Sequence, residues 1–204
     1  MNVVEWLPLA SACLAGAASP GPSLAVVLAN TMAGGRAAGL LTAWAHATGV
    51  GLYAAMTVFG LASLIAGFPT LYRGLQVAGA LYLLWLARGL LTSKGSGEGV
   101  EVPGKRTTSA LRDGFTIAFL NPKLAVFMLA LFSQFVSPDA SLGVALLLVA
   151  TATLIDGAWY SVVTLLLSRR EWLYALRSRA QSIDRLFGML LAGIAIYILA
   201  ASWL

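Results

Sequence analysis

Long apolar runs separated by short polar stretches cover almost the whole sequence. Each run has about the 20 apolar residues that a helix needs to cross a bilayer. The runs lie at 3–33, 38–67, 71–91, 113–136, 141–167 and 186–204. The pattern predicts an all-α membrane protein with six transmembrane helices, and a single polytopic domain covering residues 1–204.

A polar stretch, residues 92–112, divides the chain into two parts. It is rich in Gly, Ser, Pro and charged residues, the composition of a flexible linker. Each part, 1–91 and 113–204, holds three predicted helices. Because three is odd, the second part begins on the opposite side of the membrane. We therefore expect two inverted three-helix repeats, a plan common among secondary transporters.

Prolines interrupt the first predicted helix of each repeat, which are helices 1 and 4 of the chain. The motifs are Ser19, Pro20, Gly21, Pro22 and Ser23 in one repeat, and Asn121, Pro122 and Lys123 in the other. Proline lacks an amide hydrogen and pushes the preceding residue toward extended backbone, so both helices are expected to be broken. Membrane helices resemble one another in composition, so the repeat rests on these matching breaks.

Broken backbone is costly in lipid, so each break is expected to face protein or a water-filled cavity. A half-helix that begins near a break turns its amides and the positive end of its dipole toward that cavity. Lys123 adds a full positive charge. The arrangement predicts a site for a carboxylate, and the alternative is a pair of simple proline kinks.

Asp156 lies in the middle of the fifth apolar run. An ionised Asp at the centre of a membrane helix costs about 2.5–3.5 kcal/mol on insertion scales, so it needs a partner, a proton or water. We predict either a structural pair with Lys123 or a role in binding a substrate ammonium group or a coupling proton. His46, the sole histidine, and Asn30 and Gln134 are further candidates for the transport path. A lone membrane His more often hydrogen-bonds a neighbouring helix.

Composition and charge distribution indicate the compartment. The chain is 59% hydrophobic and 10% charged, against about 25% charged in a soluble domain. Of its 13 Lys and Arg residues, 11 lie in or beside the loops that follow the first, third and fifth predicted helices. By the positive-inside rule that side is cytoplasmic and both termini are extracytoplasmic. We expect a multi-pass protein of the bacterial plasma (inner) membrane, beside anionic lipid and without a nucleic-acid partner.

Three smaller features refine this prediction. The first run carries Glu5 and no basic residue before it, so it is expected to stay as a helix and not to be a cleaved signal. A stripe of small residues on the second helix predicts close helix packing, within one chain in preference to a homodimer face. Its members are Gly35, Gly39, Ala43, Ala47, Gly51 and Ala55. The basic segment 169–184 predicts a helix on anionic headgroups or a plain basic loop.

Catalytic and cofactor motifs are missing from the sequence. It contains no GxxxxGK[ST] loop for ATP, no GxSxG nucleophile motif and no His/Cys/carboxylate cluster for a metal. We therefore expect no enzyme activity, no cofactor and no metal site.

Taken together, the motifs resemble those of the LysE/RhtB family of amino-acid exporters. They are "SPGPS" at 19–23, "GGRAAGL" at 34–40, "ATGVGL" at 47–52, "RDGFTIAFLNPKLAVFMLALFSQF" at 112–135 and "LIDGAWYSVV" at 154–163. Where the family often has "PQF", this chain has Ser133, Gln134 and Phe135. The resemblance covers the whole chain and implies efflux of amino acids or close derivatives from the cytoplasm, driven by an ion gradient, with protons expected.

Two alternatives stay open. One is an inorganic-cation exporter of the same superfamily, although such a site usually needs several carboxylates, His or Cys and the membrane holds one Asp. The other is a non-transporting membrane scaffold, which predicts that residues beside the breaks tolerate substitution.

Overall fold

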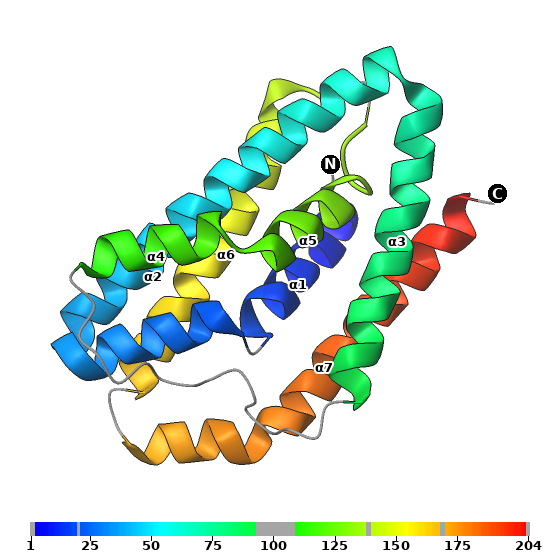
Figure 1. Ribbon diagram of the computed structural model, residues 1–204. Helices are drawn as coiled ribbons and strands as arrows, with labels where there is room; N and C mark the ends of the chain where they lie inside the picture. The colour runs from blue at the N-terminus through cyan, green and yellow to red at the C-terminus, as the bar shows by residue number, and fades with distance from the viewer. Residues whose placement is uncertain (1–2, 20, 93–108, 138–139, 168–169, 203–204) are drawn as a thin grey trace.

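A computed structural model of the protein describes residues 3–19, 21–92, 109–137, 140–167 and 170–202. Over these residues the chain forms helices and no strand, as the apolar pattern predicted. The helices are α1 (Val3–Ala18), α2 (Pro22–Gly67), α3 (Pro69–Thr92), α4 (Ala110–Phe119), α5 (Pro122–Phe132), α6 (Leu142–Leu167) and α7 (Arg170–Ser202) (Figure 1).

The first apolar run forms two helical segments, as the prolines predicted. α1 ends at Ala18 and α2 begins at Pro22, where proline suits the first helical position because it has no amide to leave unpaired. α2 then bends at Gly35, which has φ 73° and ψ −169°. Glycine adopts this backbone far more readily than any residue with a side chain. The bend folds the first part of α2, residues 22–34, back beside the long part, residues 36–67 (Figure 1).

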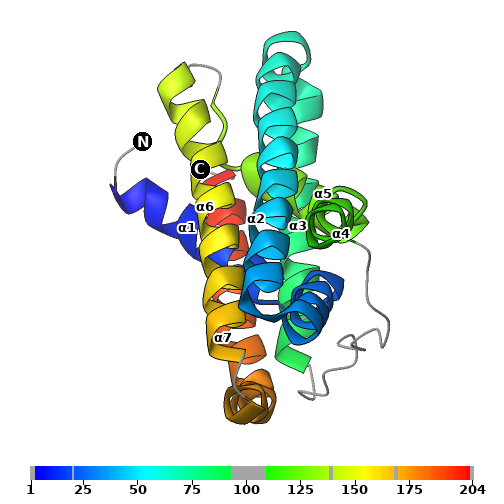
Figure 2. The same cartoon turned by 90° about the vertical axis from the view of Figure 1, so that its left-hand side faces the viewer.

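The fourth apolar run is also broken, at the predicted motif. α4 ends at Phe119, α5 begins at Pro122, and the two helices are bent by 57°. Asn121 caps α5, because its Oδ1 accepts hydrogen bonds from the amides of Lys123 and Leu124 at 3.0 and 3.4 Å. α4 and the first part of α2 lie on one side of the long part of α2 and are seen almost end-on in Figure 2.

Several helices suit a membrane. Within the described ranges, three helices are long and apolar enough to cross one, Pro22–Gly67, Thr70–Thr92 and Leu142–Leu166, and the bent α4–α5 pair makes up to four. By this criterion alone the count is smaller than the six crossings predicted from the sequence. Exposed side chains such as Leu81 and Trp85 on α3 and Leu154 on α6 provide surface for lipid.

The small-residue stripe of α2 packs against other helices of the same chain. A side chain added at Gly39 would meet Thr164 of α6, and one at Gly51 would meet Thr153 of α6. Gly35 is the exception, since it forms the bend and has nothing within 4 Å of an added side chain. The contacts within one chain agree with the favoured interpretation of the stripe.

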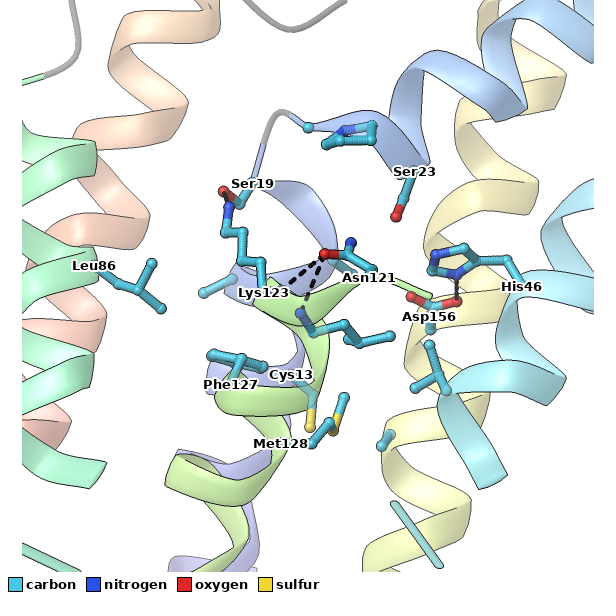
Figure 3. A pocket seen from close by; sticks show the side chains of 18 of the residues that line it. Cys13, Ser19, Ser23, His46, Leu86, Asn121, Lys123, Phe127, Met128 and Asp156 are labelled. Carbon is cyan, nitrogen blue, oxygen red and sulfur yellow. Dashed lines mark hydrogen bonds and ion pairs between the residues drawn. The ribbon is translucent and has the colours of Figure 1, made fainter. Parts of the chain in front are cut away.

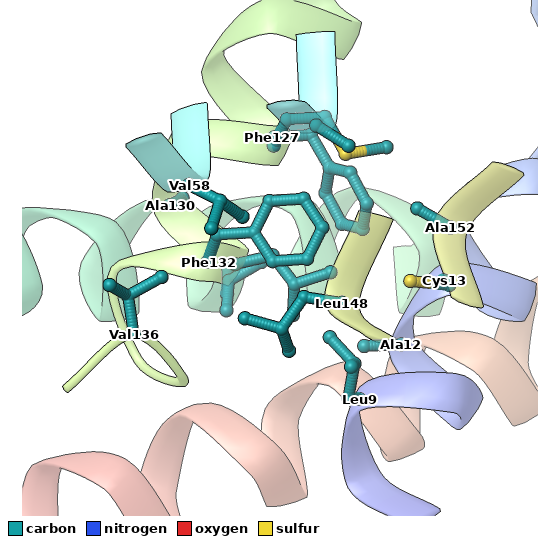
Figure 4. Close-up of a cluster of buried hydrophobic side chains, with 14 of the residues drawn as sticks. Leu9, Ala12, Cys13, Val58, Phe127, Ala130, Phe132, Val136, Leu148 and Ala152 are labelled. Atoms are coloured by element: carbon teal, nitrogen blue, oxygen red, sulfur yellow. The ribbon is translucent and has the colours of Figure 1, made fainter. Parts of the chain in front are cut away.

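A packed core holds α1 and α5 side by side. Phe132, Leu9 and Leu148 are fully buried and come from α5, α1 and α6 (Figure 4). Gly16 of α1 is so close to the ring of Phe127 on α5 that an added Cβ would lie 2.7 Å from it. In a bilayer, such complementary packing contributes more to helix association than removal of apolar surface from water. This packing brings the end of α1 and the start of α5 together at the two breaks.

Two predicted segments are only partly covered. Most of the linker, 93–108, and residue 169 of the basic segment lie outside the described residues. α7 runs from Arg170 through the rest of the basic segment and into the sixth apolar run as one helix. Contact of this segment with headgroups stays a prediction.

Candidate functional site

The two breaks open into one cavity between the helices (Figure 3). About 60 Å³ of the cavity is open to the centres of water molecules, whereas a single water needs about 10–15 Å³. The cavity can therefore hold several waters or part of a small solute. The predicted site residues that line it are Ser19, Gly21, Pro22, Ser23, His46, Asn121, Lys123 and Asp156.

The two proline motifs contact each other directly. Lys123 Nζ donates a hydrogen bond to Ser19 Oγ at 3.0 Å, across 104 positions of sequence. Figure 3 shows Lys123 extending toward Ser19, with Asn121 close by. The sequence predicted a cavity at each break, and the fold joins them into one.

The backbone amides that an anion would use lie at α2 and not at α5. At α5 the amides of Lys123 and Leu124 are already bonded to Asn121 Oδ1. Asn121, a residue type suited to a helix N-cap, thus occupies two of the amides that an anion would use at α5. At α2, Gly21 precedes the helix and no side chain caps it. An anion beside Ser23 would meet the positive end of this helix.

Asp156 pairs with His46 and not with Lys123. Asp156 Oδ2 lies 2.7 Å from His46 Nδ1, and the two residues are only 5% and 2% exposed. The predicted Lys123–Asp156 pair is wrong because Lys123 reaches Ser19 instead. His46 does bond to a neighbouring helix, as a lone membrane His often does, but it also lines the cavity.

The second ring nitrogen of His46 makes no hydrogen bond, and the ring packs against an aromatic neighbour. His46 Nε2 is buried and has no hydrogen-bond partner. The ring meets Tyr160 edge-on, with centroids 5.0 Å apart and planes at 77°. Tyr160 is buried, lines the cavity and follows Asp156 by one helical turn. Sequence reasoning missed Tyr160, although its four-residue spacing from Asp156 was a usable signal.

The rest of the cavity wall is apolar. Its larger side chains come from three helices, α3, α5 and α7, and are Leu86, Leu90, Leu124, Phe127, Met128 and Leu191. Sequence reasoning did not single these out, because nothing marks a leucine or phenylalanine of an apolar run as cavity-facing. The cavity thus combines the Lys123 cation, one carboxylate bonded to a histidine and an apolar wall, a combination that suits a small molecule with charged and uncharged parts.

Other predicted residues join helices outside the cavity lining. Asn30 donates to Thr42 Oγ1 at 3.0 Å and to Asp113 Oδ2 at 3.3 Å, which ties α2 to α4. Gln134 donates to the backbone oxygen of Gln76 at 2.8 Å, which ties the end of α5 to α3. Pro122 begins α5 without lining the cavity, and Pro20 lies outside the described residues.

A metal cluster is absent from the part of the chain that the structure describes. No group of three or more His, Cys, Asp or Glu residues there could hold a metal ion. The cation-exporter alternative therefore finds no ligand cluster in these residues.

Comparison with known proteins gives matches over most of the chain. A family model described as LysE type translocator matches residues 14–202. The chain is 26% identical over 204 residues to the threonine efflux protein of Escherichia coli (strain K12), covering 95% of this chain and 97% of that protein. It is 30% identical over 135 residues to the leucine efflux protein of Klebsiella pneumoniae subsp. pneumoniae, covering 64% and 63%. No solved structure matches.

Proposed function

The chain belongs to the LysE type translocator family, and from this premise we propose that it exports amino acids or close derivatives from the cytoplasm. The resemblance read from the motifs is confirmed by the family match, and the protein is a membrane transporter and not an enzyme. The names of two relatives, threonine efflux and leucine efflux protein, support an amino-acid cargo. The alternatives with a different cargo or with no cargo have no comparable support.

The proposed topology has six crossings in two inverted repeats, residues 1–91 and 113–204, joined by the linker 92–112. α1 with the first part of α2 is one broken crossing, and α4 with α5 is its counterpart. The long part of α2 corresponds to α6, and α3 corresponds to α7. Both termini are placed outside the cytoplasm, in a bacterial inner membrane, on the positive-inside argument. The two breaks at matching places support this arrangement.

The contacts between α2 and α6 support a central position for the charged pair. Gly39 lies against Thr164 and Gly51 against Thr153, so the two helices run antiparallel. His46 and Asp156 lie between these two contacts in sequence and bond to each other. In the proposed topology the pair is therefore near the middle of both crossings, at the depth where a transporter of this plan binds its substrate.

The observation that carries the proposal is that Lys123 and Asp156 line one cavity without bonding to each other. A zwitterion has one charge for each of them. Lys123 and the uncapped start of α2 at Ser23 would hold the carboxylate. Asp156 would hold the ammonium group, and the apolar wall would contact the side chain.

Proton coupling follows from competition at Asp156. The substrate ammonium and a proton both neutralise this buried carboxylate, so the carrier would hold one or the other. His46 Nδ1, at 2.7 Å, can share that proton. Exchange of an outgoing ammonium for an incoming proton would couple export to the proton gradient, which supplies about 2.3 kcal/mol for each charge moved through 100 mV.

Efflux from proteoliposomes tests both parts of the proposal. Vesicles preloaded with each of the twenty amino acids are diluted into neutral or acidic buffer, and loss of the amino acid is followed. We expect efflux of at least one amino acid, faster with acid outside. Asp156→Asn should lose the response to acid, whereas Asp113→Asn, a matched change outside the cavity, should keep it. An Asp156→Asn protein with the wild-type rate and response would refute proton coupling at this residue, and absence of any efflux from the wild type would refute export.

A further inference from the structure

Asp184 on α7 is a buried carboxylate that the proposed mechanism does not use. It is 3% exposed, and its Oδ1 has no hydrogen-bond partner. A carboxylate removed from water is unfavourable unless its oxygens are well paired. The sequence placed this residue at the end of the basic surface segment 169–184, but the fold turns it inward. An incompletely paired inward carboxylate indicates a place for a cationic group.

The face of α7 that carries Asp184 continues into the cavity wall. Gly188, one turn further on, packs against α3, where an added Cβ would lie 3.0 Å from the Ala87 backbone oxygen and 3.1 Å from Leu90 Cβ. Leu191 and Leu90 both line the cavity. Residues at i, i+4 and i+7 share one face of a helix. Asp184 therefore lies on the cavity-facing side of α7, displaced toward the start of that helix.

Asp184 also acts on the cation of the cavity. Lys123 Nζ is hydrogen-bonded to a neutral hydroxyl, that of Ser19, at 3.0 Å. The Asp184 carboxylate attracts the Lys123 ammonium electrostatically. Two buried carboxylates are thus associated with the region of Lys123. Asp156 lines the same cavity and is bonded to His46, whereas Asp184 lies outside the cavity lining and keeps one oxygen without a hydrogen-bond partner.

We propose that Asp184 is the entry-side ligand for the substrate ammonium group, occupied from the cytoplasm before the ammonium passes to Asp156. Lys123 would hold the carboxylate of the same amino acid in both positions. The first part of α7, residues 170–185, carries basic residues that the positive-inside rule places in the cytoplasm, which puts Asp184 on that side of the cavity. The inference rests on the proposed export of amino acids and adds a second, side-specific binding position to it.

The test compares substrate affinity from the two sides of the membrane. Inside-out vesicles expose the cytoplasmic face and right-side-out vesicles expose the outer face. Initial rates of exchange are measured in both, with the radiolabelled amino acid among the twenty that the wild type moves fastest. Asp184→Asn should raise the KM from the cytoplasmic side about tenfold, the effect of losing one charged hydrogen bond. The outer KM and the maximal rate should change by less than about twofold.

Two further variants separate this role from a structural one. Ser182→Ala, an exposed position on the same helix, should leave both KM values unchanged. Asp184→Glu keeps the charge and should recover most of the cytoplasmic affinity. If Asp184→Asn does not reach the membrane, Asp184→Glu is used in its place, and its remaining rise in KM should be confined to the cytoplasmic side. An unchanged cytoplasmic KM, an equal rise on both sides, or a loss of maximal rate alone would overturn the inference. If the wild type moves none of the twenty, the export proposal fails and the inference fails with it.

Discussion

Replacing Lys123 by Met removes the one Lys or Arg among the described residues that line the cavity, while keeping a side chain of similar length. Within the protein the change removes one hydrogen bond, from Nζ to Ser19 Oγ at 3.0 Å. Because Lys123 is exposed in the protein without substrate, solvent weakens this charged bond, and it contributes at most about 1–2 kcal/mol to stability. The protein should therefore still fold, with a small decrease in thermal stability in detergent.

The effect on transport should be much larger. If Lys123 binds the substrate carboxylate, Lys123→Met removes a charged hydrogen bond worth about 1.5–3 kcal/mol, which corresponds to roughly a 10- to 150-fold rise in KM. Lys123→Arg keeps the charge and should lose much less. Arg88→Met, an exposed cation outside the cavity lining, controls for a general effect of removing charge.

The assay uses a pair of solutes that differ only in the carboxylate. Proteoliposomes are loaded with the transported amino acid or with the amine formed by removing its carboxyl group. The wild type should discriminate against the amine by about the same 10- to 150-fold factor, and Lys123→Met should lose this discrimination because it has no group left to recognise the carboxylate. A Lys123→Met protein with a KM within about twofold of wild type and unchanged discrimination would refute the assignment.

Three further substitutions test the packing that positions the site. Gly114→Ala should lower the unfolding temperature strongly in a thermal melt, because the added Cβ would overlap the backbone of α2. Gly193→Ala is the control: no atom lies within 4 Å of its added Cβ, so it should be neutral or slightly stabilising. Tyr72→Phe should destabilise the protein by about 1–3 kcal/mol, because the one hydroxyl proton lies between two backbone oxygens after α5, those of Ser133 and Val136, each 2.6 Å from the hydroxyl oxygen. A fluorescence-detected melt would show no shift if that reasoning is wrong. Gly35→Ala should cost about 1–3 kcal/mol, because its φ of 73° and ψ of −169° form a backbone that a residue with a side chain rarely adopts. Gly60→Ala in the same helix should not have this cost, and equal melting curves for the two variants would contradict the need for glycine at the bend.

The breaks were predictable because they depend on local chemistry. Proline cannot donate a helical hydrogen bond wherever it lies in a fold, so Pro22 and Pro122 identified the starts of α2 and α5. Asn121 was recognisable as a cap for the same reason. The charge of Asp156 in an apolar run marked it as a residue that needs a partner.

The partners themselves could not be read from the sequence. Asp156 bonds to a residue 110 positions away, and Lys123 to one 104 positions away, so both choices depend on how the helices cross. The basic character of segment 169–184 concealed Asp184, because neighbouring charges suggest a surface while helix rotation decides which side chain turns inward. Tyr72, near a helix end where interfacial aromatics are common, is in fact buried and bonded to Ser133.

The claim that the cavity shared by the two breaks is the transport path is tested most directly by solute counterflow with two helix-cap variants. Asn121 and Ser109 both cap helices, α5 and α4, but only Asn121 lines the cavity. Replacing either by Leu removes a cap worth about 1 kcal/mol, and Asn121→Leu also puts an apolar side chain among Ser19, Lys123 and Asp156. We predict that Ser109→Leu retains amino-acid counterflow and that Asn121→Leu abolishes it in a protein that still folds. Wild-type counterflow by Asn121→Leu would contradict a path through this cavity.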